Sequence, residues 1–180
     1  MLWEYQFLTK LQEFRMPLLD KAMVMLSHLG DGALLWIILA VVLFLMAGTR
    51  RIGRDMIVAM IVALIIGNLI VKNVIGRVRP YDVYTMLQPL VDRPSDWSFP
   101  SGHTMHSFAA ATVLFLHERK AGIAALLLAA GIGFSRLYNM VHYPTDVLAG
   151  MLIGIVIAVL VYRFFRMGAD RGLDSAGSDR

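Results

Sequence analysis

Three cations, Lys72, Arg79 and Arg136, stand at the ends of apolar segments of this sequence. Arg79 precedes Pro80, which disfavours helical backbone, so a helix that carries Lys72 must end before it. If the apolar segments cross a membrane, three cations near its surface need a counter-anion, because unpaired charges there are costly. Asp146 supplies only one negative charge. A phosphate group, with several acceptor oxygens, would match the rest.

The stretch Pro-Ser-Gly-His opens another apolar run and holds Ser101, Gly102 and His103. The free N–H groups and the positive dipole at the start of a helix favour an anion. Gly102 would let the backbone approach that anion closely, and Ser101 could cap the helix or donate to a phosphate oxygen. We therefore predict a phosphate-binding helix start here.

His142 and Asp146 are four residues apart, with Pro144 between them. Proline is tolerated in a first helical turn, which would place Asp146 in that turn and His142 just before it. A carboxylate so placed can fix the tautomer of an imidazole and favour its cation. His142 could then attack phosphorus, and His103, which has no such partner in the sequence pattern, could protonate the departing oxygen.

Two further residues lie close to these motifs in the sequence. His106 follows His103 by three residues, a spacing open to metal binding, but we expect it to pack between helices or to hydrogen-bond locally. Arg77 could touch a substrate, but we expect a solvated surface charge. A metal-dependent hydrolase using His103, His106, His142 and Asp146 is an alternative, although we predict neither a metal site nor a cofactor.

The elements that position these residues are indicated by composition. Of 180 residues, 58% are hydrophobic and only 17% are charged, and mean hydropathy is +0.65. Soluble domains carry about a quarter charged residues, so one membrane domain is indicated. The net charge of +4 fits loops beside a membrane better than nucleic-acid binding. The absence of cysteine excludes disulfides and thiolate sites.

We predict an all-α integral membrane helical bundle, because the apolar runs lack strand alternation. About five spanning helices are expected, at 31–48, 55–76, 102–118, 121–138 and 145–166. Residues 1–30 mix apolar and charged positions, which favours amphipathic interfacial helices, with a short sixth span as the alternative. Residues 167–180 are predicted to form a disordered tail.

Lysines and arginines predict the orientation. They are concentrated in 49–54, 117–120 and the tail, once Lys72, Arg79 and Arg136 are set aside as chemical. Positively charged loops favour the cytoplasm, so the tail should be cytoplasmic and the active site should face outward in a multi-pass protein of the cell membrane.

The three motifs together resemble those of the type 2 phosphatidic acid phosphatase family of membrane lipid phosphatases. They are Lys72 with Arg79-Pro80, Pro100 to His103, and Ser135-Arg136 with His142 and Asp146. The match covers about 72–146 by motif and 31–166 by helix pattern, which defines the phosphatase domain. Three motifs in order are far more specific than one. Many members have six clear spans, whereas the first is weak here.

The resemblance implies a metal-independent phosphatase in which His142 forms a phosphohistidine, Asp146 assists it and His103 protonates the leaving group. It implies that phosphate is bound by Lys72, Arg79, Ser101, Gly102 and Arg136. We expect a lipid substrate, with undecaprenyl diphosphate at the outer leaflet favoured. Phosphatidylglycerophosphate or phosphatidic acid is the alternative, and a non-enzymatic lipid-phosphate binder or transporter is a further one. Membrane lipids are the expected partners, with no prediction of oligomeric state.

Overall fold

The computed structural model describes residues 2–177, with side chains as far as Met167. Within this range every regular element is a helix, which confirms the predicted all-α class. The helices are α1 (Leu2–Glu13), α2 (Pro17–Leu29), η1 (Asp31–Ala33), α3 (Leu34–Leu45), α4 (Arg50–Ala63), η2 (Leu64–Val71), α5 (Lys72–Ile75), α6 (Pro80–Val83), α7 (Gly102–His117), α8 (Arg119–Tyr138) and α9 (Pro144–Gly177).

Helix α7 forms the centre of the bundle and packs on α9, α8 and α4. Small residues allow the closest of these approaches, since a Cβ added to Gly150 or Gly154 of α9 would lie only 2.6 or 2.4 Å from a backbone oxygen of α7 or its N-cap. Close packing of this kind stabilises helices where lipid removes the hydrophobic drive for association. Because neighbouring helices surround α7, polar residues at its start are shielded from lipid.

Three helices are long and apolar enough to cross a membrane: Arg50–Val83, Arg119–Tyr138 and Pro144–Met167. They correspond to the predicted spans 55–76, 121–138 and 145–166. The predicted span 102–118 is α7, a helix of 16 residues that does not reach this criterion.

The predicted span at 31–48 does not form one straight helix, because the chain bends at its start. Gly32 and Ala33 both have a φ of 56°, in the left-handed region that breaks a helix. Helix α3 alone has 12 residues, about 18 Å, against a hydrocarbon core of about 30 Å. Together α2 and α3 pass as one span bent by 46°.

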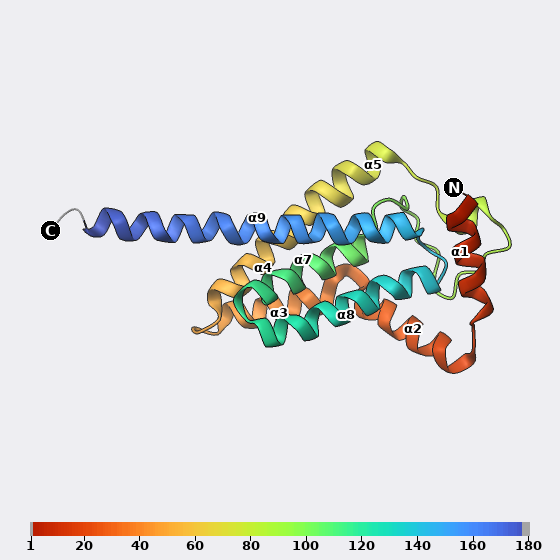
Figure 1. The fold of residues 1–180 in the computed structure, drawn as a ribbon, viewed down its shortest axis with the longest axis horizontal. Coiled ribbons are helices and arrows are strands. Elements are labelled where there is room, and N and C mark those ends of the chain that lie inside the picture. The colour runs from red at the N-terminus through yellow and green to blue at the C-terminus, as the bar shows by residue number, and fades with distance from the viewer. Residues whose placement is uncertain (1, 178–180) are drawn as a thin grey trace.

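Helices α1 and α2 pack in different places. Helix α1 lies across one end of the bundle, near the start of α9, whereas α2 packs against α8 (Figure 1). Residues 1–30 thus form two helices, α1 across the end of the bundle and α2, which meets the length and hydropathy criterion for a span only together with α3.

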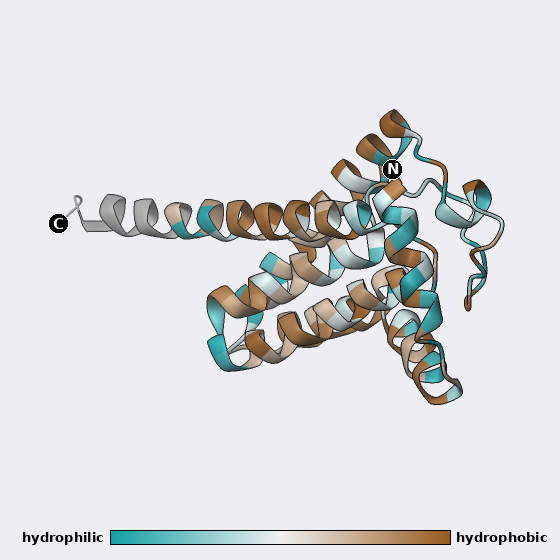
Figure 2. Cartoon of the chain, turned by 45° about the vertical axis from the view of Figure 1, so that its right-hand side comes forward, coloured by the Kyte–Doolittle hydropathy of each residue, from teal (hydrophilic) through white to brown (hydrophobic). Residues whose placement is uncertain are grey.

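The tips between α3 and α4 and between α7 and α8 lie at one end of the bundle, the end from which α9 projects (Figure 1). Hydrophobic residues dominate the helices between the two ends (Figure 2). The tail predicted to be disordered from 167 continues α9 as a helix to Gly177, and residues 178–180 lie outside the described residues.

Between α4 and α5 the helix changes its winding. Leu64–Val71 forms a π-helix, η2, which leads directly into Lys72. Such segments are rare and are frequent at functional sites. Gly67 makes room for α7 here, because an added Cβ would lie 2.1 Å from the Met105 methyl carbon.

Candidate active site

One cavity of about 570 Å³ collects most of the predicted site at the end of the bundle that α1 crosses. Six of the eight predicted residues line it: Lys72, Arg79, Gly102, His103, Arg136 and His142. The other two, Ser101 and Asp146, are fully buried next to lining residues. The motifs are therefore brought together from α5, the loop after it, α7, α8 and the start of α9.

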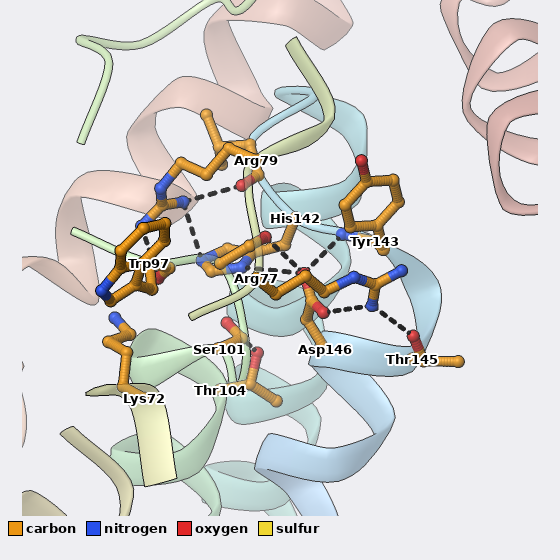
Figure 3. A network of polar contacts seen from close by, with 12 residues as sticks. Lys72, Arg77, Arg79, Trp97, Ser101, Thr104, His142, Tyr143, Thr145 and Asp146 are labelled. Carbon is orange, nitrogen blue, oxygen red and sulfur yellow. Dashed lines mark hydrogen bonds and ion pairs between the residues drawn. The ribbon is translucent and has the colours of Figure 1, made fainter. Parts of the chain in front are cut away.

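His142 lies in the short loop that joins α8 to α9 and is almost completely buried. Its Nε2 is 3.4 Å from Nη1 of Arg79, and its Nδ1 is 3.4 Å from Oδ2 of Asp146 (Figure 3). The second distance suits an ion pair but lacks hydrogen-bond geometry. A guanidinium beside Nε2 and a carboxylate beside Nδ1 favour the tautomer with the proton on Nδ1, which leaves a lone pair on Nε2.

Burial also keeps this imidazole neutral. It lowers the pKa of His142 to about 3, against the opposing hydrogen-bonding influence of Asp146, and the nearby cations Arg79 and Arg136 act in the same direction as burial. A neutral imidazole has the lone pair that a nucleophile needs.

Asp146 is fully buried in the first turn of α9, as the Pro144 spacing predicted. Its Oδ2 accepts from the Ser98 hydroxyl at 2.5 Å and from the Tyr143 backbone N–H at 2.9 Å. Its Oδ1 accepts from Nη1 of Arg77 at 2.6 Å. Several donors make a buried carboxylate stable, because each replaces a hydrogen bond to water.

The three predicted cations are buried and close to the cavity, but they have a partner that we did not predict. Asp96, in the loop before α7, bonds to Nζ of Lys72 and, at 2.5 Å, to Nη2 of Arg79. Although burial opposes its ionisation, Lys72 and Arg79 lower the pKa of Asp96 to about 2. Arg136 instead donates to the Ser27 hydroxyl of α2.

His103 has a carboxylate partner, contrary to the prediction. Its Nε2 lies 2.8 Å from Oδ1 of Asp31, a residue of the bend between α2 and α3. The other oxygen of Asp31 lies 2.7 Å from Nδ1 of His28. The bend is tight against His103, since a Cβ added to Gly30 would lie 2.7 Å from its ring.

Ser101 and Gly102 form the start of α7. The Ser101 N–H donates to the backbone oxygen of Asp146 at 3.1 Å, and its hydroxyl accepts from Thr104 at 2.9 Å. These bonds fix the start of α7 against α9. The first N–H groups of a helix have no partner within it, so the turn that begins at Gly102 can donate into the cavity.

Arg77 differs from expectation, and His106 lies at the cavity. Arg77 is not a solvated charge: its side chain is 23% exposed and pairs with Asp146 and with Glu4 of α1. His106 lines the cavity, and its buried Nδ1 has no hydrogen-bond partner among the described residues.

No three His, Asp or Glu side chains in the described part of the chain are grouped closely enough to hold a metal ion. The metal-dependent alternative would need such a group from His103, His106, His142 and Asp146.

Sequence reasoning missed four polar residues that support the site: Glu4, Asp31, Asp96 and Ser98. Asp31 had one local signal, a charged residue between two glycines where a span was expected to begin. The other three lie in segments without a pattern, and their partners are 17 to 141 residues away in the chain.

Comparisons with known proteins identify the family to which the chain is similar. The family model described as PAP2 superfamily matches residues 52–169. An undecaprenyl-diphosphatase of Sulfolobus acidocaldarius is 33% identical over 79% of this chain and 68% of its own length. Among solved structures, Aquifex aeolicus LpxE superposes with a TM-score of 0.78 at 29% identity, covering 88% of this chain and 93% of that one.

A transmembrane PAP2-type phosphatidylglycerolphosphate phosphatase from Bacillus subtilis also superposes, with a TM-score of 0.75 at 29% identity. The alignment covers 91% of this chain and 85% of that protein. The match spans most of the bundle and every element that carries a predicted motif, so the chain, a helical membrane protein, belongs to the PAP2 superfamily.

Proposed function

We propose that this protein is a membrane lipid phosphatase that removes a terminal phosphate through a phosphohistidine at His142. The observation that carries the proposal is one cavity that joins a cationic end, with His142, to an apolar groove between α3 and α4. The groove is lined by Ile37, Val41, Ile57, Met60, Ile61 and Leu64. A lipid phosphate has the same two parts, a charged head and an apolar tail.

The first step is transfer of the phosphoryl group to the enzyme. Nε2 of His142 attacks phosphorus with its lone pair, the P–N bond forms and the bond from phosphorus to the leaving oxygen breaks. His103 gives its proton to that oxygen. Lys72, Arg79 and Arg136, with the first N–H groups of α7, hold the charge that develops on the phosphoryl oxygens.

The second step regenerates the enzyme. A water molecule attacks phosphorus, the P–N bond breaks and the lone pair returns to His142. His103 accepts the proton of that water, so inorganic phosphate leaves and both histidines recover their starting states. Asp146 keeps Nδ1 oriented throughout, in the way that carboxylates orient other catalytic histidines.

Undecaprenyl diphosphate is the substrate that we favour, supported by the relative from Sulfolobus acidocaldarius. Phosphatidylglycerophosphate is the second candidate, supported by the Bacillus subtilis structural relative. An apolar groove distinguishes tails weakly, because one methylene is worth only about 1–3 kcal/mol. The identity of the lipid must therefore be measured.

The test is phosphate release by the purified protein in detergent, with undecaprenyl diphosphate, phosphatidylglycerophosphate and phosphatidic acid at equal mole fraction. We expect turnover that persists in excess chelator, and a phosphoryl label on His142 that is stable in base and labile in acid. His142→Ala should abolish both. Turnover by this variant would overturn the phosphohistidine, and a lack of release by the wild type from all three lipids would favour a non-enzymatic binder.

We further propose that the cavity opens on the extracytoplasmic side and that α9 ends in the cytoplasm, on the basis of the charge asymmetry. Because the chain has no cysteine, Arg93→Cys and Lys120→Cys each introduce a single thiol, one in the loop before α7 and one in the first turn of α8. In intact cells an impermeant thiol reagent should label only the Arg93→Cys protein. Labelling of the Lys120→Cys protein instead would reverse the orientation.

A further inference from the structure

The two partners of Arg77 are both fully buried carboxylates, from opposite ends of the sequence. Nη1 of Arg77 donates to Oδ1 of Asp146 at 2.6 Å and to the Thr145 hydroxyl at 2.7 Å. Nη2 donates to Oε2 of Glu4 at 2.6 Å. The Glu4 and Asp146 side chains are both 0% exposed. A guanidinium that bridges two buried carboxylates is held in one place, because moving it would leave a buried charge unpaired.

Glu4 also connects this network to the first turn of α9. Oε1 of Glu4 accepts from the Thr145 hydroxyl at 2.6 Å, so Glu4 of α1 contacts both Arg77 and the first turn of α9. The guanidinium also lies 3.8 Å from the centre of the Tyr143 ring, in a cation–π contact. Although burial opposes its ionisation, Thr145 and Arg77 lower the pKa of Glu4, so it remains a carboxylate.

Arg77 contacts the oxygen of Asp146 that does not face His142. It bonds Oδ1 of Asp146, whereas Oδ2 is the oxygen beside His142. Arg77 is not among the residues that line the 570 Å³ cavity, and the hydrogen bonds above engage both of its Nη atoms. Its position suits support of the carboxylate and not contact with substrate.

We propose that Arg77, held by Glu4 of α1, is a positioning residue that fixes the Asp146 carboxylate beside His142. The inference rests on the proposed phosphohistidine chemistry and assigns part of that chemistry to residues outside the three motifs. Glu4 also lies outside residues 52–169, which the family model matches.

Arg77 further limits the charge that Asp146 presents to His142. The other charged groups around this imidazole are the cations Arg79 and Arg136, which oppose its protonation. Removing Arg77 leaves the negative charge of Asp146 less compensated, which favours the imidazolium and raises the pKa of His142. Removing the charge of Glu4 strengthens the ion pair between Arg77 and Asp146. The Glu4 substitution should therefore not raise the pKa of His142.

The test compares Arg77→Gln, Arg77→Lys and Glu4→Gln with Arg93→Gln, a matched loss of an exposed arginine from the loop before α7. Arg77→Gln should lower kcat by about 10- to 100-fold, as misplacing a catalytic group does, with KM changed by less than about 3-fold. The acid limb of its kcat/KM profile should move to higher pH. Arg77→Lys should recover part of kcat, since one ammonium can pair with either carboxylate but not bridge both in the same way.

Glu4→Gln should lower kcat by less than Arg77→Gln, without an upward shift of the acid limb, and Arg93→Gln should match the wild type. If Arg77→Gln does not fold, the same two readouts, the change in kcat relative to KM and the position of the acid limb, are measured on Arg77→Lys and Glu4→Gln. The proposal is overturned by a loss confined to KM, by an unmoved acid limb, or by kcat within twofold of the wild type.

The activity of the His142→Ala variant separates the two hypotheses. If this variant retains turnover, the phosphohistidine fails and the positioning role falls with it. If it is inactive while Arg77→Gln behaves like Arg93→Gln, only the positioning role fails.

Discussion

Two histidine–carboxylate pairs serve the same cavity, and they are built in opposite ways. His142 and Asp146 are four residues apart, and the carboxylate is fully buried and accepts hydrogen bonds from Ser98, Tyr143 and Arg77. His103 and Asp31 are 72 residues apart, and the Asp31 side chain is 53% exposed. Water can replace an exposed carboxylate but not a buried one, so the first pair sets fixed geometry and the second can exchange its partner.

The largest effect should come from the buried pair. Asp146→Asn keeps the shape but removes the charge that orients His142, and in other histidine-dependent hydrolases such a change lowers kcat by about 10⁴-fold. We expect a loss of at least about 10³-fold with little change in KM, measured as phosphate release from the preferred lipid. A loss below 10-fold would mean that Asp146 contributes no more to kcat than the exposed carboxylate of the other pair.

The burial of His142 determines where the acid limb of the pH profile lies. Only neutral His142 can attack, and burial lowers its pKa to about 3 from an ordinary value of 6.5. At pH 5 an ordinary histidine is about 3% neutral, whereas this one remains almost fully neutral. The acid limb that belongs to the nucleophile should therefore lie well below pH 5 in kcat/KM. The pH dependence of kcat/KM for phosphate release measures this directly, and an acid limb near pH 6.5 would contradict it.

A smaller effect is expected from the exposed pair. Asp31→Asn removes the carboxylate beside Nε2 of His103, and solvent can take its place, so kcat for a lipid substrate should fall by about 3- to 10-fold. The loss should be smaller with p-nitrophenyl phosphate, whose leaving group needs no proton, so that only the second step still uses His103. Equal losses on both substrates would mean that Asp31 acts on binding or folding and not on the proton.

The smallest effect on activity should come from a third pair, at the far end of the bundle. Nε2 of His117 lies 2.9 Å from Oδ2 of Asp55, which is buried and also pairs with Arg54. His117→Gln should leave kcat unchanged but lower the free energy of unfolding by about 1–3 kcal/mol, because it weakens the support of a buried carboxylate. A loss of turnover with unaltered stability would show that this pair also contributes to catalysis.

Motif spacing predicted which residues gather at the cavity, because these residues follow local rules. Pro144 places Asp146 in a first turn, and Gly102 opens a helix at the cavity. The packing of apolar helices around α7 then brings these local units together, and any bundle that buries the same faces would do so.

The supporting carboxylates could not be predicted in this way. Asp31 reaches His103 because two residues with positive φ bend the chain, and Ala33 gives no sign of it in the sequence. Asp96 and Glu4 find their partners only after a long loop and α1 have packed across the end of the bundle. Local periodicity does not determine where such segments pack.

The π-helix before Lys72 has a consequence for insertions and deletions. Each residue of an α-helix turns the chain by about 100°, so one residue more or fewer rotates every side chain downstream of it. A π-helix turns the chain by less per residue, so the direction of Lys72 depends on the winding of Leu64–Val71 as well as on its length. An insertion or deletion in this segment therefore keeps the Lys72 ammonium beside its neighbours only where a change of winding compensates for it.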